Sequence, residues 1–401
     1  MPEMLVTFLK VFFWFSIACI LWMLLGYPVF LAFLSKFRKR ARLYSDPDFP
    51  SVSLIVVAYN EGKVIERKMQ NMMDLDYPED LKEIIVVDDG STDKTAEIVE
   101  RFLGRRVKLV RQTVRGGKPR GIKVGLEKAS GEIILVTDAN SFFEKDALKT
   151  LVRNFSDPNV MGVGGKFEPY VKGDEDIGLI DKLYWRFENF LKERESIVDS
   201  IIGMNGNIAA IRRNVLEKIS LKEDSIVEDF ELTVCIRKMG FRVVFEPEAY
   251  SWKLAPKGVK EGMIQKRRRS VGTIQTLIWH RDMLFNPKYG FYGALILPSH
   301  KLLPMLSPFF TVLGCIMLTF LHFFSNSILF RILFYLMLSA LVWLCIATLL
   351  SLLKPNFKHQ IVLLPKYFLV LQTSIIMAWM DYFLKTYSVA WRKAETTREI
   401  V

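Results

Sequence analysis

The sequence predicts an α/β domain inserted between transmembrane α-helices. Three observations predict this architecture. A run without charged residues lies near the N-terminus (11–35), and two more lie in the C-terminal part (302–330 and 332–353). Each exceeds the roughly 20 apolar residues that a helix needs to cross a bilayer. Between them, short apolar runs alternate with helical patterns, which is typical of parallel strands with helices on both faces.

The flanks of the apolar runs predict how the chain sits in a membrane. Basic residues, not a cleavage site, follow the first run, so it is not a signal peptide. A fourth stretch, 361–384, is predicted to span although Lys366 and Asp381 interrupt it, because charges near the ends of a span can reach the headgroups. The basic residues at 36–42 and 266–269 favour anchoring to anionic lipid on the cytoplasmic side. We expect a multi-pass protein of the cell membrane with a cytoplasmic middle region.

Charge and cysteine content exclude some classes of protein. The 401 residues carry a formal net charge of +12. No aromatic and basic pattern of a nucleic-acid reading module accompanies this charge, so we expect no nucleic-acid partner. None of the four cysteines forms a CxxC pair, so the sequence suggests neither a disulfide framework nor a zinc site.

The middle region predicts where a ligand binds. Its expected strands are 52–58, 84–87, 107–110 and 133–136, and its expected helices lie at 65–73, 95–102 and 122–129. In such sheets, ligands bind outside the carboxyl ends of the strands. The residues directly after each strand are therefore the candidate site.

Polar and acidic residues follow three of these strands. They are Tyr59, Asn60 and Glu61 after the first strand, Asp88 and Asp89 after the second, and Asp138 and Asn140 after the fourth. Carboxylates gathered at one edge destabilise each other unless a cation or donor groups neutralise them. Asp93, which follows the second group, is equally well explained as a helix cap.

Two phosphate-binding motifs are absent from the sequence. It contains no GxxxxGK[ST] loop. The run at 162–165 begins like a dinucleotide fingerprint, but Phe167 occupies the third glycine position. Neither a P-loop protein nor a dinucleotide-binding Rossmann enzyme is predicted.

A series of motifs in order resembles family 2 glycosyltransferases of the GT-A (Rossmann-like) fold. The matching segments are 56–61 (VVAYNE), 86–93 (VVDDGSTD), 117–118 (GK), 137–140 (TDAN), 227–232 (VEDFEL) and 265–268 (QKRR). The order of membrane and cytoplasmic parts resembles the processive branch, which includes cellulose, hyaluronan and poly-N-acetylglucosamine synthases. The resemblance covers about residues 50–320 and does not name the sugar.

The resemblance implies a role for each matching residue. The nucleotide-sugar is bound by Tyr59, Asn60, Glu61, Asp88, Asp89, Lys118, Asp138, Gln265 and Arg268. A divalent cation, Mg²⁺ or Mn²⁺, is held by Asp138 and Asn140. Asp229, preceded by Glu228, is the catalytic general base. Without the resemblance, both acids fit better as residues favoured by the dipole at a helix N-terminus.

Elementary chemistry agrees with these roles. A diphosphate leaving group gains negative charge, which a hard cation and the planar guanidinium of Arg268 stabilise. The acceptor hydroxyl is a poor nucleophile, so a carboxylate must take its proton. A single displacement inverts the anomeric carbon. We expect an inverting transfer from a nucleotide-diphosphate sugar, a UDP-sugar, to a lipid-linked or growing glycan acceptor among the membrane lipids.

Three positions depart from the family pattern. Asn140 replaces the second acid of the DxD motif, which weakens cation binding. Arg269 replaces the tryptophan of the QxxRW motif and suits an acceptor that carries phosphate or carboxylate. Val227 replaces the usual threonine. Polymer synthesis and transfer of one sugar to a lipid-linked acceptor therefore both stay open, as does a non-catalytic nucleotide-sugar-binding protein.

The sequence predicts five regions. They are an N-terminal transmembrane helix with its basic flank (1–42), the GT-A domain (43–260), the QxxR motif with interfacial amphipathic helices that place Trp279 at headgroup level (261–300), a C-terminal region of two or three spans (301–390), and a polar tail (391–401).

Overall fold

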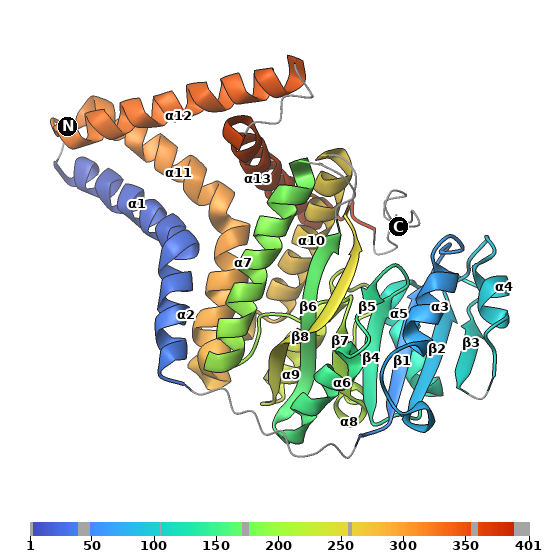
Figure 1. The fold of residues 1–401 in the computed structure, drawn as a ribbon. Helices are drawn as coiled ribbons and strands as arrows, with labels where there is room; N and C mark the ends of the chain where they lie inside the picture. The colour runs from blue at the N-terminus through green and yellow to red at the C-terminus, as the bar shows by residue number, and fades with distance from the viewer. Residues whose placement is uncertain are drawn as a thin grey trace.

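The computed structural model describes residues 3–38, 49–104, 106–170, 176–255, 259–353 and 360–388. Figure 1 shows a sheet covered by helices, with a group of long helices to one side of it. The boundary predicted at residue 42 and the tail predicted at 391–401 lie outside the described residues.

The sheet has eight strands in the order β3-β2-β1-β4-β7-β6-β8-β5. Its first four strands are parallel and match the predicted strands to within two residues. They are β1 (Val52–Ala58), β2 (Lys82–Asp88), β3 (Val107–Arg111) and β4 (Ile133–Asp138). The other half, which the alternating pattern does not predict, is mixed. It contains β5 (Phe142–Phe143), β6 (Val160–Tyr170), β7 (Ala209–Arg212) and β8 (Arg242–Leu254).

Apolar cores lie on both faces of the sheet, because successive side chains of a strand point to opposite sides. In β1, Leu54 and Val56 belong to one core and Ile55 and Val57 to the other. The first core includes α3 (Ile65–Met73), α4 (Thr95–Glu100) and α6 (Ala147–Val152). The second includes α5 (Gly117–Lys128), α8 (Arg213–Leu216) and α9 (Glu228–Lys238).

Glycines allow two close approaches in this layered arrangement. A Cβ on Gly121 of α5 would lie 2.5 Å from Val57 Cγ1, so glycine lets α5 lie directly on β1. The glycine run at 162–165 lies inside β6, where a Cβ on Gly165 would lie 2.7 Å from Ala249 O. This run therefore serves strand packing, in agreement with its exclusion as a dinucleotide motif.

Four helical segments are long and apolar enough to cross a membrane: Glu3–Lys36, Tyr292–Phe324, Ile328–Leu350 and Pro365–Leu384. The second segment begins earlier than the predicted run at 302–330, because the chain is already helical from residue 292. It also ends earlier, since residues 325–327 are not helical. The elements are α1 (Glu3–Leu21), η1 (Trp22–Gly26), α2 (Tyr27–Lys36), η6 (Tyr292–Ile296), η7 (Pro298–Leu302), α11 (Leu303–Phe324), α12 (Ile328–Leu353) and α13 (Gln360–Leu384).

Two further helices, α7 (Asp176–Val198) and α10 (Val259–Trp279), connect the sheet region to the apolar helices. The second half of α10 lies in the region predicted to hold interfacial amphipathic helices. Its Val271 and Ile274 are buried with Ala378 of α13. Lys222 Nζ lies 3.8 Å from the centroid of the Trp279 ring. The apolar side of this segment thus packs inside the protein.

A buried polar junction joins α7 to two candidate spans. Glu195 Oε1 accepts a hydrogen bond from Tyr27 Oη of α2 at 2.6 Å and lies 2.5 Å from His300 Nδ1 of η7. Glu195 Oε2 accepts from the backbone N–H of Ile202 at 2.8 Å. His300 Nε2 also lies 3.2 Å from Glu188 Oε1. The helix α7, which packs on β6 and β8, is therefore hydrogen-bonded to the apolar helices.

Candidate active site

Asp138, the last residue of β4, lies in a cluster of buried charges. Its Oδ1 accepts from Lys118 Nζ at 2.8 Å and its Oδ2 from Lys253 Nζ at 3.3 Å. Lys118 Nζ also lies 2.8 Å from Glu228 Oε1 and donates to Gly206 O at 2.8 Å, so its three N–H groups are all engaged. Burial alone would raise the pKa of Asp138, but the two lysines outweigh it and hold that pKa well below its usual value.

The first turn of α9 carries the two candidate catalytic carboxylates. Asp229 Oδ2 accepts from Gly206 N at 2.7 Å, and its Oδ1 accepts from Phe230 N at 2.9 Å. Burial raises the pKa of Glu228, and Asp229 adds to this while Lys118 opposes it. A Cβ on Gly206 would lie 3.0 Å from Lys118 Nζ and 3.1 Å from Asp229 Oδ2. Gly206 is thus the point where the predicted base and the bridging lysine meet.

Asp89 holds the start of α5 and so positions Lys118. Its two carboxylate oxygens accept from Gly116 N at 2.7 Å and from Gly117 N at 2.8 Å. Gly117 has a φ of +80°, a conformation that glycine adopts without strain. Asp88 Oδ1 accepts from Ser91 N at 3.1 Å. Asp88 and Asp89, the two predicted nucleoside contacts, therefore both accept hydrogen bonds from backbone N–H groups at the carboxyl edge of the sheet.

The residues after β1 form a second group beside this one. Asn60 has a φ of 50°, and its Oδ1 accepts from Thr92 N at 2.8 Å. The N–H of the buried Glu61 donates to Thr95 Oγ1 at 2.8 Å. The guanidinium carbon of Arg115 lies 3.8 Å from the centroid of the Tyr59 ring. These contacts tie the loops after β1 and β2 together at the carboxyl edge of the sheet.

The helix α10 carries Gln265 and Arg268 one turn apart, so they share a face. Burial lowers the pKa of the Arg268 guanidinium, while Glu228, Asp138 and Asp229 oppose this, which places it within electrostatic reach of all three. Gln265 is half-buried and forms no hydrogen bond through its side chain within the described part of the chain. The structure thus brings Arg268 to the charge cluster but does not join Gln265 to it.

The two neighbours of Arg268 have other contacts. Arg267 forms a two-pronged pair with Asp381 of α13, in which both N···O distances are 2.5 Å. The guanidinium carbon of the exposed Arg269 lies 5.8 Å from the centroid of the Trp185 ring. Arg267 thus binds a carboxylate inside a candidate span, where the sequence predicted an anchor to lipid. The pair also explains why an acidic residue is tolerated there.

The residues predicted to hold a cation fit a hard, oxygen-liganded ion. Each Asp138 oxygen uses one lone pair on a lysine and keeps another for a ligand. The amide of Asn140 is buried two positions further along the same turn. An amide oxygen is a ligand for hard cations, although it adds no charge. The set supplies few protein ligands, so an ion here needs oxygens from its substrate as well.

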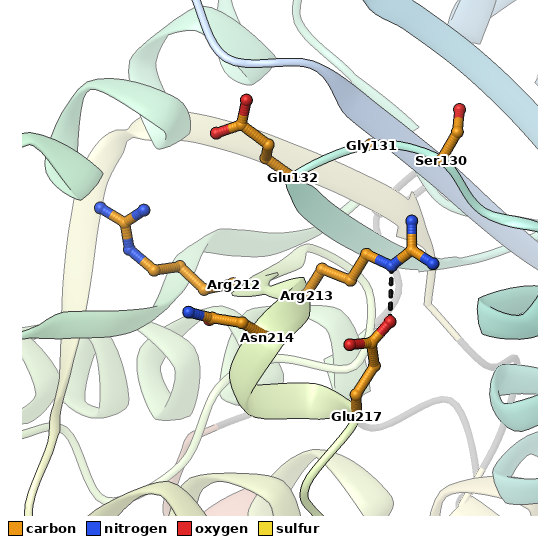
Figure 2. Close-up of a pocket in the computed structure, with 7 residues that line it drawn as sticks. All are labelled: Ser130, Gly131, Glu132, Arg212, Arg213, Asn214 and Glu217. Atoms are coloured by element: carbon orange, nitrogen blue, oxygen red, sulfur yellow. Dashed lines mark hydrogen bonds and ion pairs between the residues drawn. The ribbon is translucent and has the colours of Figure 1, made fainter.

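One described hollow of the surface lies away from this site. A cavity of about 300 Å³ is lined by seven residues, which Figure 2 shows. Gly131 and Glu132 directly precede β4, and Arg213 pairs with Glu217 at 2.7 Å. Since β4 runs from this cavity to Asp138, the length of the strand separates the two. The cavity contains none of the predicted site residues.

Four residues in and beside the candidate site were missed in the sequence analysis. Lys253 comes from β8, and Gly206 lies in the loop before β7. Arg115 follows β3, with no motif to mark it. Lys68 had a signal, because it lies on the apolar face of α3. Its buried Nζ donates to Ser141 O at 2.5 Å beneath the turn after β4, and burial lowers its pKa to about 7.

Comparisons with known proteins all lead to glycosyltransferases or glycan synthases. Residues 53–220 match the family described as glycosyl transferase family 2. This segment is a family 2 glycosyltransferase domain. A poly-beta-1,6-N-acetyl-D-glucosamine synthase from Staphylococcus epidermidis is 27% identical over 232 residues, which cover 57% of this chain and 55% of that protein. The enzyme of the same name from Staphylococcus aureus (strain COL) is 25% identical over 302 residues, which cover 71% and 72%.

The chain spans about half the length of the first of these relatives. A solved structure covers more of it. The mannosyltransferase PcManGT from Pyrobaculum calidifontis, in complex with GDP-Man and Mn²⁺, superposes with a TM-score of 0.69 and 24% identity. The superposition covers 94% of this chain and all of that one. At this identity the likeness shows the fold, which is GT-A-like, as the sequence predicted.

Proposed function

We propose that this chain is an inverting glycosyltransferase that moves a sugar from a nucleoside-diphosphate sugar to a membrane-associated acceptor. One observation carries the proposal. Asp138, Lys118, Glu228, Asp229 and Arg268 converge at the carboxyl edge of a GT-A-like sheet. Of the helices that carry them, α10 packs against α13 and η7, and α9 packs against η6, all within segments able to cross a membrane.

The geometry suggests how the chain's own residues divide the work. Asp229 is held as an acceptor by two backbone N–H groups, which orients its remaining lone pairs toward an acceptor hydroxyl. Glu228 fixes Lys118 through their ion pair. Lys118 and Arg268 are cations placed to stabilise the leaving diphosphate. Tyr59, with Arg115 over its ring, offers a flat surface for the base of the nucleotide.

A divalent cation, Mg²⁺ or Mn²⁺, held by Asp138 and Asn140, neutralises charge on the diphosphate when it is bound. Because Asn140 adds no charge, we expect this binding to be weaker than with two acids. Lys253, which lies 3.3 Å from Asp138 Oδ2, adds positive charge near the diphosphate and so offsets part of the weaker cation binding.

The nature of the acceptor separates two versions of the proposal. The synthase names of the relatives suggest a β-linked polysaccharide. Transfer of a single sugar to a lipid-linked acceptor is favoured by the exposed Arg269, a cation that suits a phosphate group near the reaction centre. We place the catalytic domain on the cytoplasmic side, as the basic residues beside the first span predict.

The test uses purified full-length protein and a panel of nucleotide-sugars that includes UDP-sugars and GDP-mannose, with Mn²⁺ or Mg²⁺. Release of nucleoside diphosphate and the size and anomeric configuration of the product are measured. We expect Asp229→Asn to lower turnover by about 10²–10⁴-fold, because general base catalysis is removed. Turnover that survives this change intact would falsify the assignment of the base.

A further inference from the structure

A second group of metal-binding side chains lies apart from the candidate active site. Glu231 and Cys235 are one turn apart on α9, and His280 directly follows α10. A carboxylate oxygen, the sulfur and a ring nitrogen of these residues lie within 4.8 Å of one another. In a tetrahedral zinc site such atoms are roughly 3.3–3.8 Å apart, so the three side chains need to close by about 1 Å.

The cluster holds buried polar atoms without partners. Glu231 is only 1% exposed, and its Oε2 forms no hydrogen bond to any residue that the structure describes. The same holds for both ring nitrogens of His280. Buried polar atoms of native proteins are nearly all hydrogen-bonded, and exceptions mark places where a water or an ion binds. Three such atoms in one cluster therefore point to a ligand.

We propose that Glu231, Cys235 and His280 bind one zinc ion. Thiolate, imidazole and carboxylate are the three ligand types that Zn²⁺ takes in proteins, and a thiolate disfavours Mg²⁺. Residues four apart on a helix share a face, so Glu231 and Cys235 can reach the same ion. Water completes the tetrahedron.

The protonation states of the cluster determine which proton this binding must displace. Burial and the nearby Glu231 raise the pKa of the Cys235 thiol to about 11, although Lys238 and Lys222 oppose this. The thiol therefore carries its proton in the absence of a metal and releases it to solvent when the Zn–S bond forms. Burial lowers the pKa of His280 to about 4, so its ring is neutral and keeps a lone pair for the ion.

The location of the cluster suggests a structural role. The helix α9 starts with the predicted base Asp229, and α10 carries Arg268. Lys238 Nζ, at the end of α9, already lies 2.9 Å from Asp282 Oδ2. The ion joins the same two segments a second time and fixes the distance between the helices of the base and the arginine. A motif search misses it because His280 is far from Cys235 in sequence.

The inference is tested by metal binding and does not depend on glycosyl transfer. Full-length protein in detergent is stripped with a chelator and titrated with Co²⁺, which reports a thiolate ligand by a near-ultraviolet charge-transfer band. We expect one equivalent per chain with this band. We expect Cys235→Ser to abolish the band and His280→Gln to weaken Co²⁺ binding at least about 10-fold. The matched control Cys315→Ser, in a candidate span, keeps it.

A wild-type protein without the band, or a band unchanged in Cys235→Ser, overturns the proposal. An ion bound only by oxygen ligands at Asp138 gives no thiolate band, so it is told apart. If Cys235→Ser does not fold, alkylation of the wild-type protein decides. Zinc must slow the modification of Cys235, located by mass spectrometry, and equal rates with and without zinc refute the site.

Discussion

Gly206→Ala tests whether the meeting point of Lys118 and Asp229 determines activity. The new Cβ lies 3.0 Å from Lys118 Nζ, 3.1 Å from Asp229 Oδ2 and 3.3 Å from Glu228 Oε1. Ordinary contacts are about 3.5–4.0 Å, so these groups must move by roughly 0.5 Å. Since a displacement of about 1 Å can cost about 10²-fold in rate, we expect kcat to fall about 10-fold.

The stability of this variant should change less than its activity. Overpacking costs about 1–3 kcal/mol, while replacing glycine by alanine at an ordinary φ stabilises by about 0.4–1 kcal/mol through the unfolded chain. Thermal unfolding in detergent measures the balance, and nucleoside diphosphate release measures kcat.

Gly203→Ala is the matched control for this prediction. It lies in the same loop, and its new Cβ meets nothing closer than Phe230 Cδ2 at 3.4 Å. The control should keep nearly full activity. Equal activity of the two variants would show that the positions of Lys118 and Asp229 do not limit the reaction.

Three further predictions concern charges. Lys118→Met should lower the free energy of unfolding by about 3–5 kcal/mol, because two buried carboxylates lose their shared cation; a loss below about 1 kcal/mol in denaturant titration contradicts this. Although burial opposes it, hydrogen bonds, chiefly from Lys108, lower the pKa of Glu83 to about 2 from 4.5. Its stabilisation is therefore full above pH 4.5 and is lost as the pH falls toward 2. After discounting for screening by solvent, Glu83→Gln should lower the free energy of unfolding by about 1–2 kcal/mol and reduce the loss of stability below pH 4.5. An unchanged pH dependence of unfolding in this variant argues against the role of Glu83. For Arg267→Met and Asp381→Asn, a double-mutant cycle of thermal unfolding should give a coupling of about 1–2 kcal/mol, whereas additive effects mean that the pair contributes nothing.

The sequence predicts the parallel half of the sheet well and the mixed half poorly, for physical reasons. β1, β2 and β4 are buried on both faces, so each is a continuous apolar run that ends in polar residues. β6 contains glycines, which pack closely against their neighbours, and β8 carries buried or paired charged residues. Neither strand therefore shows the apolar run or the alternation that marks a strand in a sequence.

The same difference applies to the site. The motifs predicted Asp138, Lys118 and Asp229, which the structure brings together, because each stands at the end of a predictable element. Lys253 and Gly206 reach the cluster only through the packing of the mixed half. No local pattern encodes such a long-range contact.

The bonds of Glu195 to Tyr27 and His300 have a practical consequence. Soluble versions of membrane enzymes are commonly made by deleting the flanking helices, on the assumption that these only tether a self-sufficient domain. Here such a deletion would leave the buried carboxylate of Glu195 without its bonds to Tyr27 and His300, beside the loop that leads to Gly206. Both α2 and η7 are better regarded as components of the GT-A-like fold, and we expect residues 27, 195 and 300 to change together among related sequences.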